Sequence, residues 1–154
     1  MQLSKGFDYA VRSLVFLARL PEGGTADLRA ISLTQGVPHS YLAKVMRSLV
    51  RRGLVVSTLG REGGYRLRRP PREITLLEVF TAMEGELRLV ECMDGKSCAF
   101  LGGCAQAEVW HRLRHAVETI FRETTLWDLL REGRADLPAG DPSKKEGRYA
   151  RAGA

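Results

Sequence analysis

The only cysteines in the chain are Cys92, Cys98 and Cys104, and five residues separate each from the next. Three thiols in one short segment that contains glycines can converge on a single metal centre. Thiolates select soft metals, which means zinc, copper(I) or an iron–sulfur cluster. The spacing is wider than in the cysteine pairs of structural zinc sites, so a loop that wraps a larger object, such as a cluster, fits it better. An odd number of cysteines also excludes a complete set of internal disulfides.

Charge is divided unevenly along the 154 residues. Residues 1–72 contain 13 Lys and Arg against 4 Asp and Glu, whereas residues 73–154 contain 11 against 14. A basic first half favours a polyanionic partner, and nucleic acid is the default one. The start of the chain does not resemble a secretion signal, and no apolar run reaches membrane-spanning length. We therefore expect a cytoplasmic protein with no membrane partner.

The first half of the chain has the pattern of three helices followed by a β-hairpin. Ser4 suits the N-cap of the first helix, Thr25 or Asp27 that of the second, and Gly53 the residue after the third. The predicted helices span 3–20, 26–35 and 40–52, and the predicted strands span 54–58 and 65–67 around a glycine-rich turn.

The second and third helices differ in how their apolar residues are spaced. In the second helix the apolar positions are Leu28, Ile31 and Leu33. In the third, helical periodicity predicts a core-facing side that consists of Leu42, Val45, Met46 and Leu49.

The second half begins with a short helix over 76–83, capped by Thr75, and continues through the cysteine segment to a long helix over 105–122. One side of the long helix is apolar, and a second copy of the chain is the simplest partner for it. Thr125 should cap a last helix over 126–130. The apolar stripe consists of Val109, Trp110, Leu113, Ala116, Val117, Ile120 and Phe121.

The order of elements predicts a mainly α protein. Residues 1–72 would form a winged helix-turn-helix with a small β-hairpin wing. Residues 73–131 would hold the cysteine loop and the dimerisation helix, and residues 132–154 have the composition of a disordered tail. No Ser/His/Asp triad or pair of carboxylates stands out, so we expect no catalytic site and no enzyme.

In a winged helix-turn-helix the third helix enters the major groove of DNA, because its width fits the groove. Hydroxyls and cations on the outer side of that helix can reach phosphates and base edges. Its candidate contacts are Ser40, Tyr41, Lys44, Arg47, Ser48 and Arg51. In the wing, glycines such as Gly63 allow a close approach to the DNA backbone or minor groove, with Arg61 as the contacting side chain.

These residues resemble the Rrf2 family of winged-helix transcription regulators, in the branch that contains the iron–sulfur regulators IscR and NsrR. The resemblance covers about residues 1–131. Its carriers are Leu3-Ser4-Lys5, Tyr9-Ala10, Pro38-His39-Ser40-Tyr41-Leu42-Ala43-Lys44, Gly53-Leu54-Val55, Gly63-Gly64-Tyr65-Arg66-Leu67 and the cysteine triplet. It implies a homodimer in which each subunit holds one cluster near the base of the long helix, and double-stranded DNA with a palindromic operator as the partner.

Two departures bear on the fourth cluster ligand and on the wing. The IscR type has a histidine three residues after the third cysteine, where this chain has Ala107. The NsrR type uses an N-terminal aspartate that reaches across from the other subunit, and Asp8 stands in the matching place here. The resemblance thus favours a [4Fe-4S] over a [2Fe-2S] cluster, with Cys92, Cys98, Cys104 and Asp8 as ligands. If Asp8 is not the fourth ligand, His111 or a small exogenous molecule is next in line. Many members carry arginine where this chain has Leu59, which moves the expected wing contact to Arg61.

The function that follows is a dimeric transcription regulator whose operator binding responds to nitric oxide, redox state or cluster supply. One alternative keeps the regulator but replaces the cluster with zinc or a direct thiol switch. A small iron–sulfur electron carrier would be a different class, and it leaves the basic winged helix unexplained. A module that binds other proteins would leave the cysteine triplet unexplained.

Overall fold

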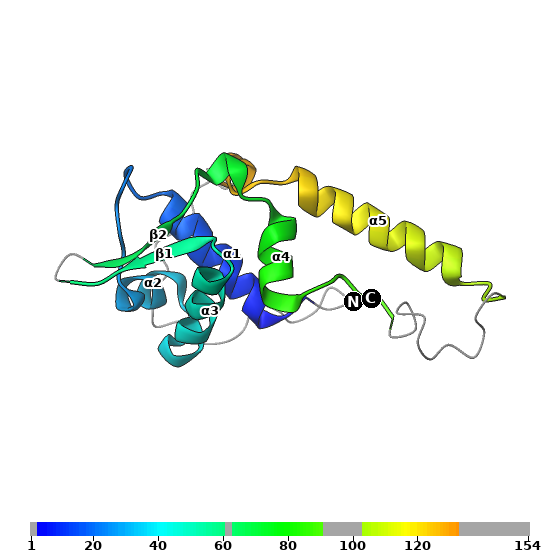
Figure 1. Ribbon diagram of the computed structural model, residues 1–154, viewed down its shortest axis with the longest axis horizontal. Coiled ribbons are helices and arrows are strands. Elements are labelled where there is room, and N and C mark those ends of the chain that lie inside the picture. Colours follow the sequence, from blue (N-terminus) through cyan, green and yellow to red (C-terminus); the bar gives the residue numbers. More distant parts are fainter. Residues whose placement is uncertain (1–2, 61–62, 91–102, 133–154) are drawn as a thin grey trace, which may run out of the picture.

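The computed structural model describes residues 3–60, 63–90 and 103–132 (Figure 1). Arg61, Cys92, Cys98 and residues 133–154 of the predicted tail lie outside the described residues. In chain order the elements are α1 (Lys5–Ala18), α2 (Leu28–Gln35), α3 (His39–Arg51), β1 (Val55–Thr58), β2 (Gly64–Leu67), the 3-10 helix η1 (Pro71–Glu73), α4 (Leu76–Glu84), α5 (Ala107–Glu123) and α6 (Leu126–Glu132).

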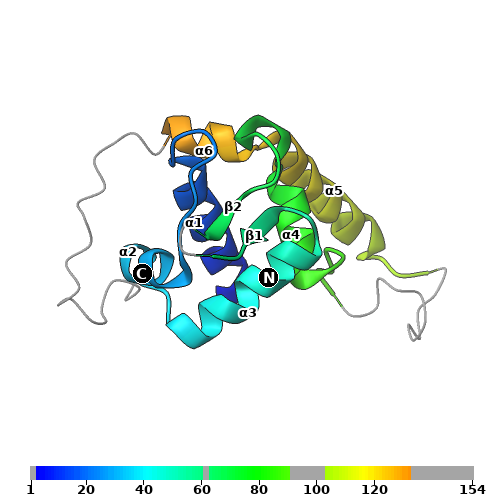
Figure 2. The same ribbon diagram turned by 60° about the vertical axis from the view of Figure 1, so that its left-hand side comes forward.

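Helices α1 to α4 form one body with the β1–β2 hairpin on its side, and α5 reaches out from this body as a long arm (Figure 1). Turned by 60°, the molecule shows α6 lying across the end of α1 (Figure 2). The two strands pair antiparallel, with Val55 opposite Leu67 and Thr58 opposite Gly64. The mainly helical winged helix-turn-helix predicted from the sequence is confirmed.

Local side-chain chemistry fixes the helix ends close to the predicted positions. The Ser4 hydroxyl accepts a hydrogen bond from the Phe7 amide at the start of α1. At α2 the cap is Asp27 rather than Thr25, since its carboxylate accepts a hydrogen bond of 2.7 Å from the Ala30 amide. Helix α2 then ends at Gly36, whose φ of 63° is left-handed and suits glycine.

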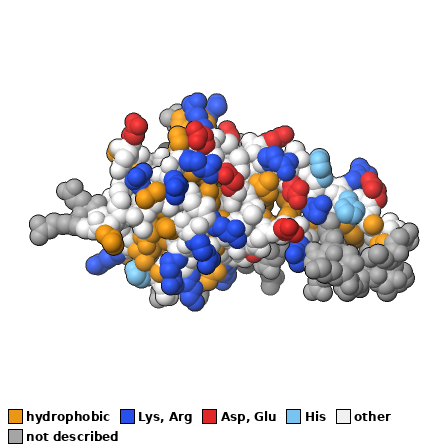
Figure 3. Space-filling model, viewed as in Figure 1, with side chains coloured by type: hydrophobic (Ala, Val, Ile, Leu, Met, Phe, Trp, Pro, Cys, Tyr) orange, Lys and Arg blue, Asp and Glu red, His pale blue; other side chains and the backbone are white. Residues whose placement is uncertain are grey.

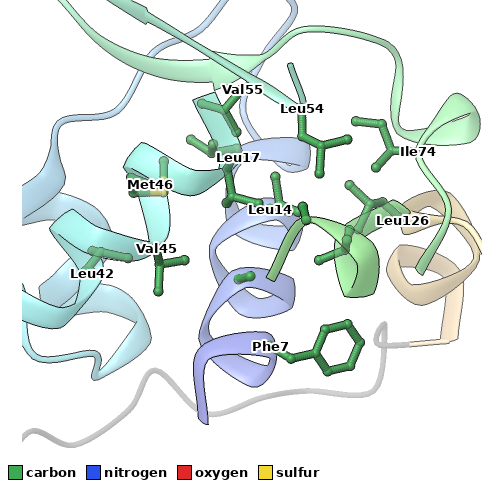
Figure 4. Packing of buried hydrophobic residues seen from close by; sticks show 14 of the residues in the cluster. Phe7, Leu14, Leu17, Leu42, Val45, Met46, Leu54, Val55, Ile74 and Leu126 are labelled. Atoms are coloured by element: carbon green, nitrogen blue, oxygen red, sulfur yellow. The ribbon is translucent and has the colours of Figure 1, made fainter. Parts of the chain in front are cut away.

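The core lies where α1, α3, α4 and α6 meet beneath the hairpin (Figure 4). Leu14 and Leu126, from opposite ends of the described chain, are both fully buried. Full burial of a leucine side chain contributes about 1.5–3 kcal/mol, so the docking of α6 stabilises the body of the protein. The four predicted core positions of α3 are also buried, as expected: Leu42, Val45, Met46 and Leu49.

Leu33, one of the apolar positions of α2, does not face the core, because its side chain is 73% exposed. It stands two residues after Ile31, which is fully buried. Two residues turn an α-helix by about 200°, so Ile31 and Leu33 cannot share one face. With only 8 residues, α2 has a single buried side chain to anchor it.

The apolar stripe of α5 is divided between two environments. Near its C-terminal end, Val117 and Phe121 pack against the core of the same chain. The Phe121 ring stacks on Phe7 with ring centroids 5.7 Å apart. Val109, Leu113 and Ile120 are instead 58%, 44% and 60% exposed. Val117 and Phe121 are thus partly covered by their own chain, whereas Val109, Leu113 and Ile120 form the exposed part of the stripe.

Candidate nucleic-acid interface and metal centre

Helix α3 presents a basic face on the side opposite its buried leucines. Lys44, Arg47 and Arg51 follow one another at intervals of three and four residues, and all three are exposed. Ser40 and Tyr41 are exposed at the N-terminal end of the same helix. This spacing places the five side chains along one side of an α-helix, as a groove-binding helix requires.

The cations on this face are not neutralised by the part of the chain that the structure describes. Within residues 3–60, 63–90 and 103–132, no carboxylate forms an ion pair with Lys44, Arg47 or Arg51. Arg47 donates from Nε to the Ala43 carbonyl of the same helix at 3.3 Å. Lys and Arg side chains gather over α3 in Figure 3, and no acidic side chain appears among them in that view. Such a surface attracts a polyanion.

Tyr41 is held in place by α1. Its ring meets the Tyr9 ring edge to face, with centroids 5.4 Å apart. A methyl group at Gly6 would lie 3.3 Å from the Tyr41 hydroxyl oxygen, so a larger residue there would press on α3. Tyr41 remains 41% exposed. The start of the candidate recognition helix is thus positioned by the first turns of α1.

Ser48 differs from the other predicted contacts of α3. Its hydroxyl donates to the Ala82 carbonyl of α4 at 3.0 Å, which directs it inward. The expectation of an outward Ser48 is wrong because a free carbonyl near the end of α4 lies within its reach.

The end of the wing turn has room only for glycine at position 63. A side chain at Gly63 would clash with the carbonyl oxygen of Thr58. The Thr58 hydroxyl donates to the Gly64 carbonyl at 3.3 Å, and the Gly63 amide donates to the Gly60 carbonyl at 3.0 Å. Gly63 therefore has a structural reason to be glycine besides the close approach to DNA predicted for it. Leu59 is fully exposed beside this turn.

A strand-like contact also docks the wing on the segment before α2, which the sequence did not reveal. Ala26 and Tyr65 exchange two backbone hydrogen bonds, of 3.0 and 2.8 Å. Backbone pairing of this kind leaves no side-chain signal, since any residue can supply the amide and carbonyl groups. The contact fixes the wing relative to the helix-turn-helix.

Of the predicted metal ligands, Asp8 and Cys104 are described. Asp8 lies in the first turn of α1, with its side chain 49% exposed. Cys104 is a free thiol of intermediate exposure just before α5. Within residues 3–60, 63–90 and 103–132, no three His, Cys, Asp or Glu side chains converge as a metal site, but two of the three cysteines lie outside this range.

A single chain does not bring the two described ligands together. The start of α1 lies on the body, whereas the start of α5 lies at the far end of the arm, in both Figure 1 and Figure 2. The start of α1 is tied instead to the end of α4, where the Ser4 hydroxyl donates to Glu84. A thiolate and a carboxylate are a donor set that can bind iron, so Asp8 and Cys104 can be ligands of the same cluster only if they come from two different copies of the chain.

The fold and the basic face together define a winged-helix DNA-binding regulator. Among the described residues, no helix is long and apolar enough to cross a membrane. The chain belongs to the Rrf2 family, whose model is described as an iron-dependent transcriptional regulator and matches residues 3–132. The family and its relatives are transcriptional regulators and not enzymes.

Three similar proteins illustrate the range of the family. The transcriptional regulator NsrR of Halalkalibacterium halodurans is 32% identical over 132 residues, which cover 84% of this chain and 90% of that protein. The structure of IscR from T. potens has a TM-score of 0.73 at 27% identity and covers 91% of this chain and 94% of its own. CymR, the global cysteine regulator of B. subtilis, also gives 0.73, at 30% identity, covering 86% of this chain and 98% of its own.

Proposed function

We propose that this Rrf2-family regulator binds an operator as a homodimer under the control of an iron–sulfur cluster. The observation that carries the proposal is the triplet Cys92, Cys98 and Cys104, because three soft ligands at equal spacing in one loop select a cluster or a soft metal. The resemblance to NsrR and IscR supports the same reading. The fold is equally similar to that of a cysteine regulator, so the fold alone does not identify the signal to which this regulator responds.

The homodimer is supported by the uncovered part of α5. Val109, Leu113 and Ile120 are exposed on a helix that has no buried residue. Apolar side chains along an amphipathic helix need a partner surface, and two copies of α5 can cover each other. The same arrangement brings the start of one arm toward the body of the other subunit, so Asp8 of one chain can join the three cysteines of its partner as a fourth ligand of a [4Fe-4S] cluster.

The DNA interface that we propose consists of α3 and the wing. In it Ser40, Tyr41, Lys44, Arg47 and Arg51 face the major groove, and Arg61 and Gly63 approach the backbone from the wing. Two such units in a symmetric dimer read two half-sites, whose separation must match the helical repeat of DNA. A small rotation of the subunits therefore changes operator affinity strongly.

A bound cluster would react with nitric oxide or oxidants, which makes its loss a chemical signal. In this proposed switch, the protein connects the cysteine loop to α5 and to the start of α1. Because Tyr9 of α1 contacts Tyr41 of α3, a change at Asp8 lies one residue from the contact that positions the recognition helix.

The test is anaerobic purification followed by a visible spectrum and assays of iron and sulfide. We expect a brown protein, and loss of both iron and sulfide in each of Cys92→Ala, Cys98→Ala and Cys104→Ala. A colourless protein with bound zinc would replace the cluster by a zinc site, and a metal-free protein with thiol-dependent DNA binding would replace it by a thiol switch. Salt-dependent binding to duplex DNA separates all three from an electron carrier.

A further inference from the structure

The end of α5 is joined to the start of α4 by backbone pairing. Thr75 and Thr125 form an isolated antiparallel bridge. The Leu76 amide donates to the Thr124 carbonyl, and the Leu126 amide donates to the Ile74 carbonyl, both at 2.9 Å. Two hydrogen bonds between segments about 50 residues apart fix the point at which the long arm meets the body.

Each threonine of this bridge also caps a helix. The Glu78 amide donates to the Thr75 hydroxyl, and the Thr75 amide donates to Glu78 Oε2 at 2.9 Å, which is a complete capping box. Thr125 and Asp128 repeat the arrangement at the start of α6. We call this pair of bridged, capped helix starts the α4–α6 joint, defined by Thr75, Glu78, Thr125 and Asp128.

The other carboxylate oxygen of Glu78 binds the base of the wing. Arg69, two residues after β2, donates from Nη2 to Glu78 Oε1 at 2.6 Å and from Nη1 to the Glu73 carbonyl at 3.0 Å. Glu78 is therefore shared, with one oxygen on the helix cap and the other on the arginine. Both terminal nitrogens of Arg69 thus form hydrogen bonds with residues at or next to the joint.

We propose that Arg69 and Glu78 are positioning residues that tie the wing to the α4–α6 joint and so hold the wing and the long arm in one fixed relation. The inference rests on the proposed role of α3 and the wing in DNA binding. It follows that operator affinity depends on a pair of residues that do not touch DNA. When a substitution removes one contact of such a network, the affinity for DNA changes even though the fold is retained.

The variant that isolates the link is Glu78→Gln. Glutamine also completes a capping box, so its carbonyl oxygen can keep the Thr75 amide bond while its NH₂ group opposes Arg69. The substitution removes a negative charge, which by itself strengthens binding to DNA. A positioning role predicts the opposite sign, with affinity for an operator duplex reduced on the order of 2- to 30-fold.

Glu73→Gln is the matched control. It removes the same charge from the neighbouring 3-10 helix, where the exposed carboxylate has no partner among the described residues, and it leaves the Glu73 carbonyl in place. We expect its DNA affinity to equal or exceed that of the wild type. In Glu78→Gln, hydrogen exchange at the Leu76 and Leu126 amides should stay slow, and the melting temperature should change by less than about 4 °C, since an exposed ion pair contributes little to stability.

Arg69→Gln distinguishes a positioning arginine from one that binds phosphate. Measured by fluorescence anisotropy over a range of salt concentrations, a positioning role predicts an unchanged salt slope and no further loss when Arg69→Gln is combined with Glu78→Gln. A lower salt slope and additive losses would overturn the proposal, as would unchanged or tighter binding in Glu78→Gln. Lys44→Ala, measured in parallel, tests the interface itself. If Lys44→Ala weakens binding and Glu78→Gln does not, only the link is wrong; if neither variant weakens binding, the proposed DNA surface on which the link rests is wrong as well.

Discussion

Asp8 and Arg12, one turn apart on α1, form a two-point ion pair in the single chain. Arg12 Nη2 lies 2.8 Å from Asp8 Oδ2, and Arg12 Nε donates to Asp8 Oδ1 at 3.1 Å. Both side chains are close to half exposed, so the pair contributes little to stability. Coordination of a partner's cluster by Asp8 therefore requires only a weak ion pair to rearrange.

The first prediction concerns Asp8 as the fourth ligand. A carboxylate is a harder ligand than a thiolate, so its bond to cluster iron should be the first to break. Asp8→Ala should keep cysteine-bound iron but change the visible spectrum and the rate of reaction with nitric oxide, and Asp8→Cys should make the cluster more persistent. Arg12→Gln, which leaves the carboxylate in place, should keep the wild-type spectrum. If Asp8→Ala matches the wild type in both measurements, the fourth ligand is another group, with His111 or a small exogenous molecule next.

The second prediction separates the two parts of the α5 stripe. Leu113→Glu, at an exposed position, should leave the fold intact and yield monomers in analytical ultracentrifugation, with weak operator binding. Phe121→Ala removes a ring that contacts both Phe7 and Phe80, so it should destabilise the monomer fold by about 3 kcal/mol in urea unfolding. His115→Glu, about 200° around the helix from Leu113, is the control and should remain dimeric. A wild type that sediments as a monomer at micromolar concentration would refute the proposed interface.

The third prediction tests the basic face of α3. Lys44→Ala and Arg47→Ala should each weaken DNA binding, and a residue that contacts a phosphate should lower the salt slope by about one. A base-reading residue should instead cost about 1–3 kcal/mol and relax the preference at one base pair. Arg19→Ala, at an exposed cation on the C-cap of α1, removes the same charge away from this face and should change affinity little. Equal effects of all three substitutions would indicate general charge attraction without a specific contact surface.

The fourth prediction concerns stability in acid. Burial alone would raise the pKa of Glu78, but the hydrogen bond from the Thr75 amide and the Arg69 guanidinium outweigh it and hold the pKa below its ordinary 4.5. The hydrogen bonds from Thr125 likewise hold the pKa of Asp128 below its ordinary 3.8. A depressed folded-state pKa stabilises the fold fully above the ordinary value, and this stability is lost as the pH falls through the folded-state pKa.

The free energy of unfolding should therefore decline as the pH is lowered below about 4.5, as measured by urea titration at successive pH values. Glu78→Gln and Asp128→Asn should each make the decline less steep. The control Glu73→Gln should leave its shape unchanged, because the Glu73 carboxylate makes no hydrogen bond among the described residues. An identical decline in all four proteins would place the acid-sensitive groups elsewhere.

The sequence alone determined those features that depend on neighbours along the chain. The periodicity of Leu42, Val45, Met46 and Leu49 predicted the buried face of α3, and Thr75 and Ser4 predicted two helix starts, because both signals arise within one or two helical turns. The glycine-rich turn predicted the wing for the same reason. The cysteine triplet and the basic first half indicated the class of chemistry without any coordinates.

Only the tertiary structure decided what depends on segments distant in sequence. It turned Ser48 toward the Ala82 carbonyl, and it divided the α5 stripe when Val117 and Phe121 packed onto their own core. It also joined Ala26 to Tyr65 and Thr75 to Thr125 through backbone groups, which every residue carries and no sequence pattern marks. The segments that folding brings next to a side chain decide how much of it stays exposed. Helical periodicity therefore indicates that a stripe is apolar, but not which surface will cover it.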